Sequence, residues 1–422
     1  MMVVMKRSMI SMGVAAILAS PAYATNGMNL EGYGAKSAAM GGTMMAYDIG
    51  NSGMMGNPAT LGLRKEGNNF GIGVTWMQPD VNASIPAYGM SADSGGDSYL
   101  MPSMSFIRKD GSFTYGVGVF AQGGMGTEYS GSSFLSGGTG LEQRSELGFG
   151  RVMFPLAYQV TDELIVAGQV DYVWGSLDLK MLQMDSMGNG GYINASDDND
   201  FTGEMSGSGF AFKLGAVYTF NKEFSMGATY HSETNIGDME GSGTVMPFAG
   251  GMTPGAMPAN FSVVDFQWPE TFGIGMAWNA TPELMFAADI KQLMWSKSMK
   301  DFTMSTEIAG YGTSTQTMPQ NWDDQTVYSI GAQYKIDPAV ALRIGYNYGK
   351  NPIPDNTLNP LFPAITESHF TFGAGWQIDK SNSLAIAFTY APEVTQTMAN
   401  PTMPIEMSHS QTLWRLNYAY SF

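Results

Sequence analysis

The chain ends in QTLWRLNYAYSF (residues 411–422), and this stretch decides the expected fold. Every second position carries a large apolar side chain, at Trp414, Leu416, Tyr418, Tyr420 and Phe422. The residues between them are smaller or polar, at Arg415, Asn417, Ala419 and Ser421. Because successive side chains of a strand point to opposite faces, one face is apolar up to the last residue. Such a closing strand is typical of a barrel that faces lipid.

The same period of two recurs upstream, over residues 164–174, 210–220, 340–348 and 370–378. The polar face of these stretches is mild and consists mostly of Gly, Ala, Thr, Gln and Asn. A soluble sandwich would show water a charged face, whereas a membrane barrel turns apolar residues to lipid and polar residues to its lumen. We therefore predict an all-β antiparallel transmembrane β-barrel.

The connections between these stretches alternate strictly between short and long. Short polar turns lie at residues 109–111, 160–162, 221–222, 279–282, 337–338 and 379–382. Long loops lie near residues 79–99, 122–146, 181–208, 231–267, 297–323, 349–367 and 391–408. Periplasmic turns are short and extracellular loops are long in outer-membrane barrels. Six short and seven long connections predict a 14-stranded barrel with both ends in the periplasm.

Two different stretches precede the alternating part. Residues 1–24 are expected to be a secretory signal peptide, with Lys6 and Arg7 before an apolar run and Ala22-Tyr23-Ala24 as the cleavage site. Residues 25–66 carry too many glycines for a stable helix and lack the alternation of a strand. We expect this stretch to form an N-terminal hatch inside the lumen. The predicted domains are thus the signal peptide (1–24), the hatch (25–66) and the barrel (67–422).

Composition excludes several classes of function. The 422 residues carry a net charge of −17 and no cysteine, which argues against nucleic acid as a partner and against a disulfide scaffold. The histidines His369 and His409 have serine neighbours, but adjacent strand residues face opposite sides and cannot form a Ser–His pair. We expect no enzymatic activity, no cofactor and no metal, with the histidines placed in loops or at the rim.

Several short motifs, in order, resemble the FadL/TodX-like family of outer-membrane transporters for long-chain fatty acids and hydrocarbons. They are Asn26-Gly27, Gly32 to Ser37, Met40-Gly41-Gly42, Asn57-Pro58-Ala59, Trp268-Pro269-Glu270, Asn321 to Asp324, Arg343 to Tyr346 and Pro352 to Asp355. The resemblance covers most of the chain after residue 24. It implies a plugged barrel of the bacterial outer membrane that takes up hydrophobic molecules and releases them sideways through a gap at a kinked third strand.

The resemblance also implies where the functional residues lie. The third strand is expected at residues 112–122, ending where glycines interrupt pairing. The residues of the hatch and gate would be Asn57, Pro58, Ala59, Phe120, Gly123 and Gly124. Ligand-binding candidates are Met54, Met55, Lys180 and Lys297. The family's two basic lumen positions fall here on Gly175 or Lys180 and on Asp323, so recognition of a carboxylate stays open.

Two other functions remain as alternatives, namely a general porin for polar solutes and a structural or adhesive surface barrel. Mildly polar inward faces disfavour the porin, and the Asn57-Pro58-Ala59 hatch motif has no role in the adhesive reading. The expected partners are a hydrophobic small molecule, outer-membrane lipid and lipopolysaccharide, with the chain acting as a monomer. The acidic loop Asp197 to Asp200 is read as solvated surface, with Ca²⁺ binding between lipopolysaccharides as the alternative. The sequence does not name the ligand.

Overall fold

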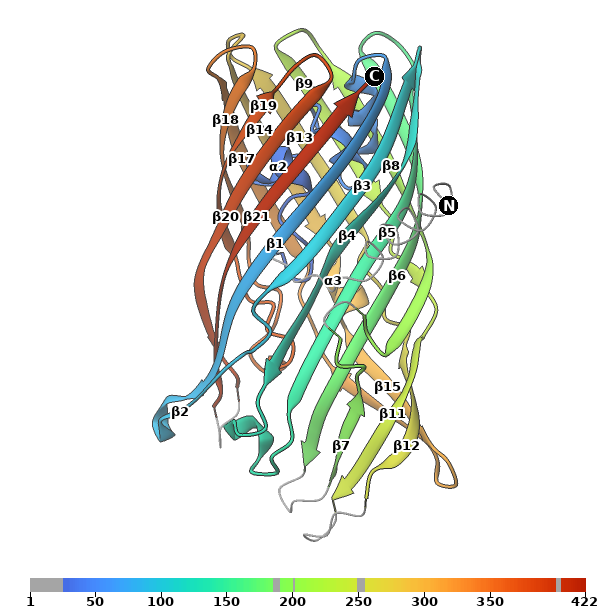
Figure 1. Cartoon of the computed structure of the whole chain (residues 1–422), viewed down its shortest axis with the longest axis vertical. Coiled ribbons are helices and arrows are strands. Elements are labelled where there is room, and N and C mark those ends of the chain that lie inside the picture. The colour runs from blue at the N-terminus through green and yellow to red at the C-terminus, as the bar shows by residue number, and fades with distance from the viewer. Residues whose placement is uncertain (1–25, 185–189, 200–201, 249–254, 400–403) are drawn as a thin grey trace, which may run out of the picture.

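The computed structural model describes residues 26–184, 190–199, 202–248, 255–399 and 404–422. These residues form one tall barrel of tilted strands (Figure 1). The predicted all-β antiparallel barrel is therefore confirmed. The predicted signal peptide, residues 1–24, lies outside the described residues. Across the described ranges, no helix has the length and apolar character needed to cross a membrane.

The wall is a ring of antiparallel strands in which β21 returns to pair with β1 along 16 residue positions. In order around the ring, the strands are β1 (Gly67–Ile85), β3 (Tyr99–Asp110), β4 (Phe113–Tyr129), β5 (Gln143–Gln159), β6 (Leu164–Met184), β8 (Met205–Thr219), β9 (Phe224–His231), β13 (Thr271–Asn279), β14 (Leu284–Leu293), β17 (Gln325–Lys335), β18 (Val340–Gly349), β19 (Ser368–Gln377), β20 (Asn382–Thr397) and β21 (Glu406–Ser421). Each strand of the ring pairs with one neighbour on either side over at least part of its length, so the ring is closed, as a lipid environment requires.

Alternation along β21 places its residues as the sequence predicts. Trp414 and Leu416 are 43% and 44% exposed on the outside, whereas Arg415 between them is 1% exposed and points inward. The same outward apolar face appears on β19 at Phe370 and Phe372. Lipid solvates the outer face, so these large apolar side chains need no protein partner there.

Short turns join strands at the end of the barrel that carries the C-terminus, at the top of Figure 1. The long connections at the other end are not plain loops. They contain β2 (Met90–Asp93), β7 (Gly190–Ala195), β10 (Asn235–Ile236), β11 (Met239–Phe248), β12 (Met257–Val264), β15 (Asp301–Ile308) and β16 (Gly312–Pro319), with the short helices η3 (Pro86–Tyr88), η4 (Phe134–Ser136) and α3 (Trp295–Ser298). The sheet of the described residues thus holds 21 strands, so the predicted fourteen is too low a count for it. The additional strands lie outside the ring listed above.

Residues 26–64, here called the N-terminal segment, lie within the ring (blue in Figure 1). The segment forms only short helices, namely α2 (Gly34–Ala38), η1 (Gly50–Met54) and η2 (Pro58–Leu63). Nearly all of its residues are buried. It reaches the wall on several sides, because α2 packs on β19, β20 and β21 whereas η2 packs on β5, β6 and β8. Glycines explain the short helices, since each costs about 1 kcal/mol relative to Ala in a helix.

The largest buried apolar cluster joins inward-facing wall residues to residues of the long connections, such as Ile85, Phe362 and Ile405. Three tryptophans of this cluster, Trp268, Trp295 and Trp322, are among the largest fully buried side chains. We call the whole of this apolar cluster, with its three tryptophans, the aromatic cluster. It includes Met28, at the start of the N-terminal segment.

Candidate functional site

Strand pairing between β3 and β4 stops part-way along the wall. The register runs from Asp110 opposite Phe113 to Ser103 opposite Phe120, where it ends in the described part of the chain. Strand β4 nevertheless continues to Tyr129. Beyond Phe120 it pairs with β5 alone, through an irregular register between Ala121 and Gly123. The wall therefore has a gap in its hydrogen bonding along the β3 side of residues 121–127.

Local sequence explains this gap. Pro102 precedes the last paired residue of β3 and has no N–H to offer a neighbouring strand, which confines proline to unpaired edges. Gly123 and Gly124 follow the irregular position on β4. The interruption predicted beside these glycines is present, although β4 extends to Tyr129 rather than ending at Gln122. Phe120 marks the boundary, since it is the last β4 residue paired with β3.

The start of the N-terminal segment covers this gap from inside. The N–H of Gly124 donates to the carbonyl oxygen of Met28 at 3.1 Å, and Asn29 forms a β-bridge with Gly123. A Cβ on Gly123 would overlap the Met28 carbonyl, so only glycine permits this approach. The Tyr33 hydroxyl donates to the carbonyl oxygen of Gln122 at 2.6 Å. Residues 28–33 thus take the place of the missing strand neighbour.

The hydrogen bonds of the Asn57-Pro58-Ala59 motif go to β8 and to the segment itself. Its Asn57 side chain donates to the carbonyl oxygens of Met45, at 2.7 Å, and of Ala216 on β8, at 2.9 Å. The same amide accepts the N–H of Ala59 at 3.1 Å and caps η2. No hydrogen bond of Asn57 joins it to residues 120–126 within the described chain, and the expected contact there stays a prediction. The motif holds the segment against β8. Which part of the wall a residue meets depends on the path of the whole segment.

A buried ion pair fixes the segment to the closing strand. Both carboxylate oxygens of Glu31 accept from the Arg415 guanidinium of β21, at 2.7 and 2.9 Å. Thr389 of β20 also donates to Glu31 at 2.7 Å. Both charged side chains are fully buried. Such bidentate pairing with further hydrogen bonds offsets the cost of removing two charges from water.

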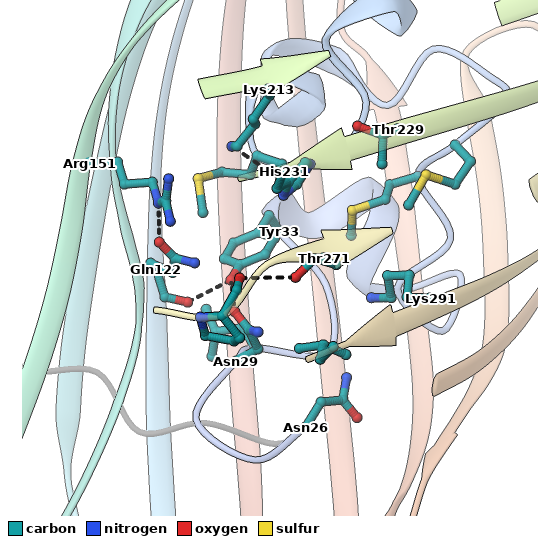
Figure 2. Close-up of a pocket in the computed structure, with 16 residues that line it drawn as sticks. Asn26, Asn29, Tyr33, Gln122, Arg151, Lys213, Thr229, His231, Thr271 and Lys291 are labelled. Atoms are coloured by element: carbon teal, nitrogen blue, oxygen red, sulfur yellow. Dashed lines mark hydrogen bonds between the residues drawn. The ribbon is translucent and has the colours of Figure 1, made fainter. Parts of the chain in front are cut away.

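A cavity lies between the N-terminal segment and the wall (Figure 2). It is lined by Asn26, Asn29, Leu30, Tyr33, Met44, Met45, Met55, Gln122, Arg151, Lys213, Thr229, His231, Pro269, Thr271, Lys291 and Leu293. Figure 2 shows Lys213 and His231 on one side of the cavity and Asn26 on the other. The sequence reading missed this group of basic residues. Lys213 is a charged inward-facing residue whose inward-facing neighbours on the strand are small. This pattern in the sequence could have indicated the site.

Two of these cations are already paired. Arg151 of β5 and Lys213 of β8 both contact the Asp171 carboxylate of β6, at 2.8 and 3.5 Å. Lys213 also donates to the carbonyl oxygen of Met54 at 2.8 Å. Among the described residues, the hydrogen bond found for Lys291 of β14 is a long one of 3.4 Å, to the carbonyl oxygen of Glu31. Lys291 is thus the cation least occupied by other groups in this cavity.

The four predicted ligand-binding residues lie in different places. Met55 lines the cavity, and Met54 is buried beside Phe120. Lys180 is not available to a ligand, because it pairs with Asp198 and lies 3.4 Å from Glu142. Lys297, on α3, is 63% exposed and pairs with Glu233 at 2.6 Å. That hydrogen bond raises the pKa of Lys297 and keeps the side chain charged.

A second cavity adjoins the gap in the wall. It is bounded by Leu30 and Tyr33 of the segment, by Met101 to Ser103 of β3 and by Phe120 and Ala121 of β4, and it reaches Val74. Val74 is 37% exposed on the outer face of β1. This cavity therefore lies between the covering residues and the lipid-facing surface, where a lateral passage would run.

The histidines are not at the rim as expected. His369 and His409 are buried inward-facing residues of β19 and β21, and His231 lies 2.8 Å from the carbonyl oxygen of Gly56. One ring nitrogen of each meets an oxygen, since the Nδ1 of His409 lies 2.9 Å from the Pro363 carbonyl and that of His369 lies 3.2 Å from the Asn347 side-chain oxygen. Within the described ranges, no three His, Asp or Glu side chains are grouped to hold a metal ion. Of the acidic loop, Asp198 pairs with Lys180, and Asp200 lies outside the described residues.

Comparison with known proteins adds an independent observation. The model of a family described as outer membrane protein transport protein (OMPP1/FadL/TodX) matches residues 11–422. The crystal structure of the toluene transporter TodX of Pseudomonas putida is similar, with a TM-score of 0.84 and 29% sequence identity. That similarity covers 93% of this chain and 99% of the other.

Two proteins with similar sequences match very different lengths of this chain. The long-chain fatty acid transport protein of Escherichia coli K12 is 21% identical over 415 residues, which cover 90% of each chain. An uncharacterised protein encoded beside a phosphoenolpyruvate carboxykinase gene in Chlorobium limicola is 65% identical over 65 residues. Those residues are 15% of this chain and 32% of that protein.

Proposed function

The chain belongs to the OMPP1/FadL/TodX family of outer-membrane transport proteins, and from this premise we propose that it takes up hydrophobic molecules and releases them sideways into the membrane. The observation that carries the proposal is the gap between β3 and β4, covered from inside by Met28 and Asn29. A ring paired throughout would leave a ligand no way through its wall.

The proposed path runs from the long connections inward. A hydrophobic ligand first enters the aromatic cluster, where Trp and Phe rings offer apolar surface. It then reaches the cavity of Figure 2 and passes Met28 and Tyr33 to the second cavity at the wall. Release at Phe120 puts it directly into lipid, so it never has to cross water. No energy source is part of this proposal, because partition into lipid favours an apolar solute.

In this proposal the N-terminal segment is a hatch and residues 67–422 are the barrel domain. Residues 57–63 hold the hatch in place, and residues 26–33 are the part that moves. The gate residues are Phe120, Gly123 and Gly124, as the sequence predicted, with Met28, Asn29 and Tyr33 in place of the motif at Asn57. Methionines suit such a path because their flexible side chains adapt to ligands of different shape.

The ligand is hydrophobic, and Lys291 decides whether it can carry an acid group. This side chain faces the cavity from β14 and is the cation least occupied there. We propose no role for Lys180 or Lys297 in ligand binding, because carboxylates of the protein already occupy both. We propose that the channel acts as a monomer, without catalysis. A water-filled porin fits poorly, because the N-terminal segment fills the lumen with buried side chains.

Engineered cysteines test the lateral route. The chain has no cysteine of its own, so a pair at Pro102→Cys and Ala121→Cys, two residues that both line the second cavity at the gap, is the only thiol pair. Bridging this pair by oxidation or a short bifunctional reagent should stop uptake of toluene or oleate into proteoliposomes, and cleaving the bridge should restore it.

The control pair is Met104→Cys and Val119→Cys, two residues further along each strand, where β3 and β4 are already paired. Bridging this pair should leave uptake unchanged. Undiminished uptake through a bridged gap would place the exit elsewhere. If the unaltered protein moves neither toluene nor oleate faster than empty vesicles, the proposed function itself is wrong.

A further inference from the structure

The aromatic cluster contains hydrogen-bond donors without an acceptor in the described part of the chain. The indole nitrogens of Trp295 and Trp322 have no hydrogen-bond partner among the described residues, although both side chains are almost completely buried. Their rings meet edge to face with centroids 5.3 Å apart. The third indole of the cluster differs, because Trp268 donates to the Asn29 side chain at 3.1 Å. Two buried N–H groups are therefore left over beside one that is satisfied.

Polar side chains without partners lie next to these indoles. Asn26 is 1% exposed, and neither its amide nitrogen nor its oxygen has a partner within the described ranges. The residue after it, Gly27, brings the backbone close to the Trp295 indole. A Cβ atom added at Gly27 would lie 2.8 Å from the indole nitrogen of Trp295. Gln325 has an unpartnered side-chain oxygen, and its amide nitrogen lies 3.1 Å from the Cβ position at Gly349. The Asn26 oxygen lies 3.3 Å from the same position.

Buried polar groups of native proteins almost always have partners, because each unsatisfied group costs about 1–3 kcal/mol. Four such side chains lie around one end of an otherwise apolar cluster. This end of the cluster can therefore bind a polar atom. Indole N–H groups only donate, and they carry no charge. They suit an uncharged oxygen acceptor, whereas a carboxylate is matched better by a cation such as Lys291.

We propose that the aromatic cluster selects hydrophobic molecules that carry one uncharged oxygen, such as an aromatic ketone, phenol or fatty alcohol. The apolar body lies among the Trp and Phe rings, and its oxygen accepts from Trp295 and Trp322. An alcohol or phenol hydrogen is donated in turn to the oxygen of Asn26 or Gln325. This inference rests on the proposed uptake of hydrophobic molecules and adds the chemical class that is preferred.

The test uses two probes that differ in one group, ethylbenzene and acetophenone. Dissociation constants are measured by calorimetry for the full-length protein and for Trp295→Phe and Trp322→Phe. Each variant keeps an aromatic ring and loses one N–H. For each probe the variant is compared with the unaltered protein, so that partitioning into detergent cancels. Acetophenone should bind about two- to tenfold more weakly to each variant, as one neutral hydrogen bond predicts, and ethylbenzene should bind equally well.

The packing comparison is Trp268→Phe, which alters the same cluster but removes an indole N–H that the Asn29 side chain already accepts. A loss of packing weakens both probes to the same degree in any of the three variants, whereas the proposal requires a greater loss for acetophenone than for ethylbenzene at Trp295 and Trp322 and no such difference at Trp268. Equal effects on the two probes, or none, would overturn it and leave ordered water as the partner of these indoles. Ethylbenzene uptake by the unaltered protein reports separately on the proposed function, because that probe has no oxygen.

Discussion

Two parts of the N-terminal segment meet the same wall in opposite ways. Around Asn57 the segment is bonded on every side, and Ala59 packs among small apolar residues of β5, β6 and β8. Around Asn29 it meets the wall through a few hydrogen bonds, at a place where the wall itself lacks a strand partner. We therefore expect the two ends to respond differently when their contacts are removed, with the Asn29 end depending on the Glu31–Arg415 pair and on its few bonds to β4.

The largest effect should come from breaking the ion pair that holds the Asn29 end. Glu31→Gln leaves the buried Arg415 guanidinium without its counter-charge, a change that typically costs about 3–5 kcal/mol. Hydrogen exchange followed by mass spectrometry should show faster exchange for residues 26–33, with residues 57–63 changed much less.

A matched control is the double variant Glu31→Gln and Arg415→Met, which removes both charges. It should recover much of the protection, since replacing both members of a buried pair is far milder than removing one. Uniform loss of protection over the whole segment in the single variant would show that the two ends are one rigid unit.

The second effect tests the fixed end. Asn57→Ala removes two donated bonds and one accepted bond in a buried site, and each group left unsatisfied costs about 1–3 kcal/mol. Exchange should accelerate at residues 57–63. The variant Asn57→Ser keeps an uncharged cap acceptor for the Ala59 N–H and should lose less, so equal losses for the two would show that the cap contributes nothing.

A smaller effect on stability, but a visible one on transport, should follow from Gly123→Ala. The added methyl group overlaps the Met28 carbonyl and pushes the covering residues off the gap. We expect faster exchange at the Gly124 amide and faster uptake of toluene, with the Asn57 end unchanged. The control is Gly168→Ala on β6, where nothing lies within 4 Å of the new methyl group. Slower uptake in the Gly123 variant would mean that Met28 guides the ligand instead of covering the gap.

The smallest effect should come from Lys297→Met. Its pair with Glu233 is largely exposed, and such pairs contribute about 0–1 kcal/mol. Neither exchange of the segment nor uptake of oleate should change measurably. A clear loss of oleate uptake with normal toluene uptake would restore the carboxylate-binding role that the sequence analysis gave to this lysine.

The outer face of the barrel could be predicted because its solvent is uniform. At Phe370 and Phe372, alternation alone fixes which side chain meets lipid, and no distant residue changes that answer. The short turns follow for the same reason, since their polar residues act locally. The gap could also be predicted in part, because glycines at 123 and 124 weaken a strand, and Pro102 marks an unpaired edge.

The interior could not be predicted to the same degree, because its contacts join residues far apart in the chain. The Asn57 amide reaches β8, 159 residues away, and nothing in the motif specifies that strand. Lys180 looked free in the sequence because its partner Asp198 lies beyond the strand, in a connection without a periodic pattern. The covering role of Met28 depends on a glycine almost a hundred residues later. Such pairings need the path of the whole segment, which local patterns do not contain.

The Glu31–Arg415 pair also links the position of the N-terminal segment to closure of the ring. Its members are 384 residues apart, and Arg415 lies on β21, the strand that seals the ring against β1. Contacts of the segment with β4, β8 and β14 can form on an unfinished chain, but this one cannot. A chain that stops before β21 therefore has both an open wall and a buried carboxylate without a counter-charge. Both defects occur together, so an incomplete chain should have a loosely held N-terminus that a periplasmic protease can cleave.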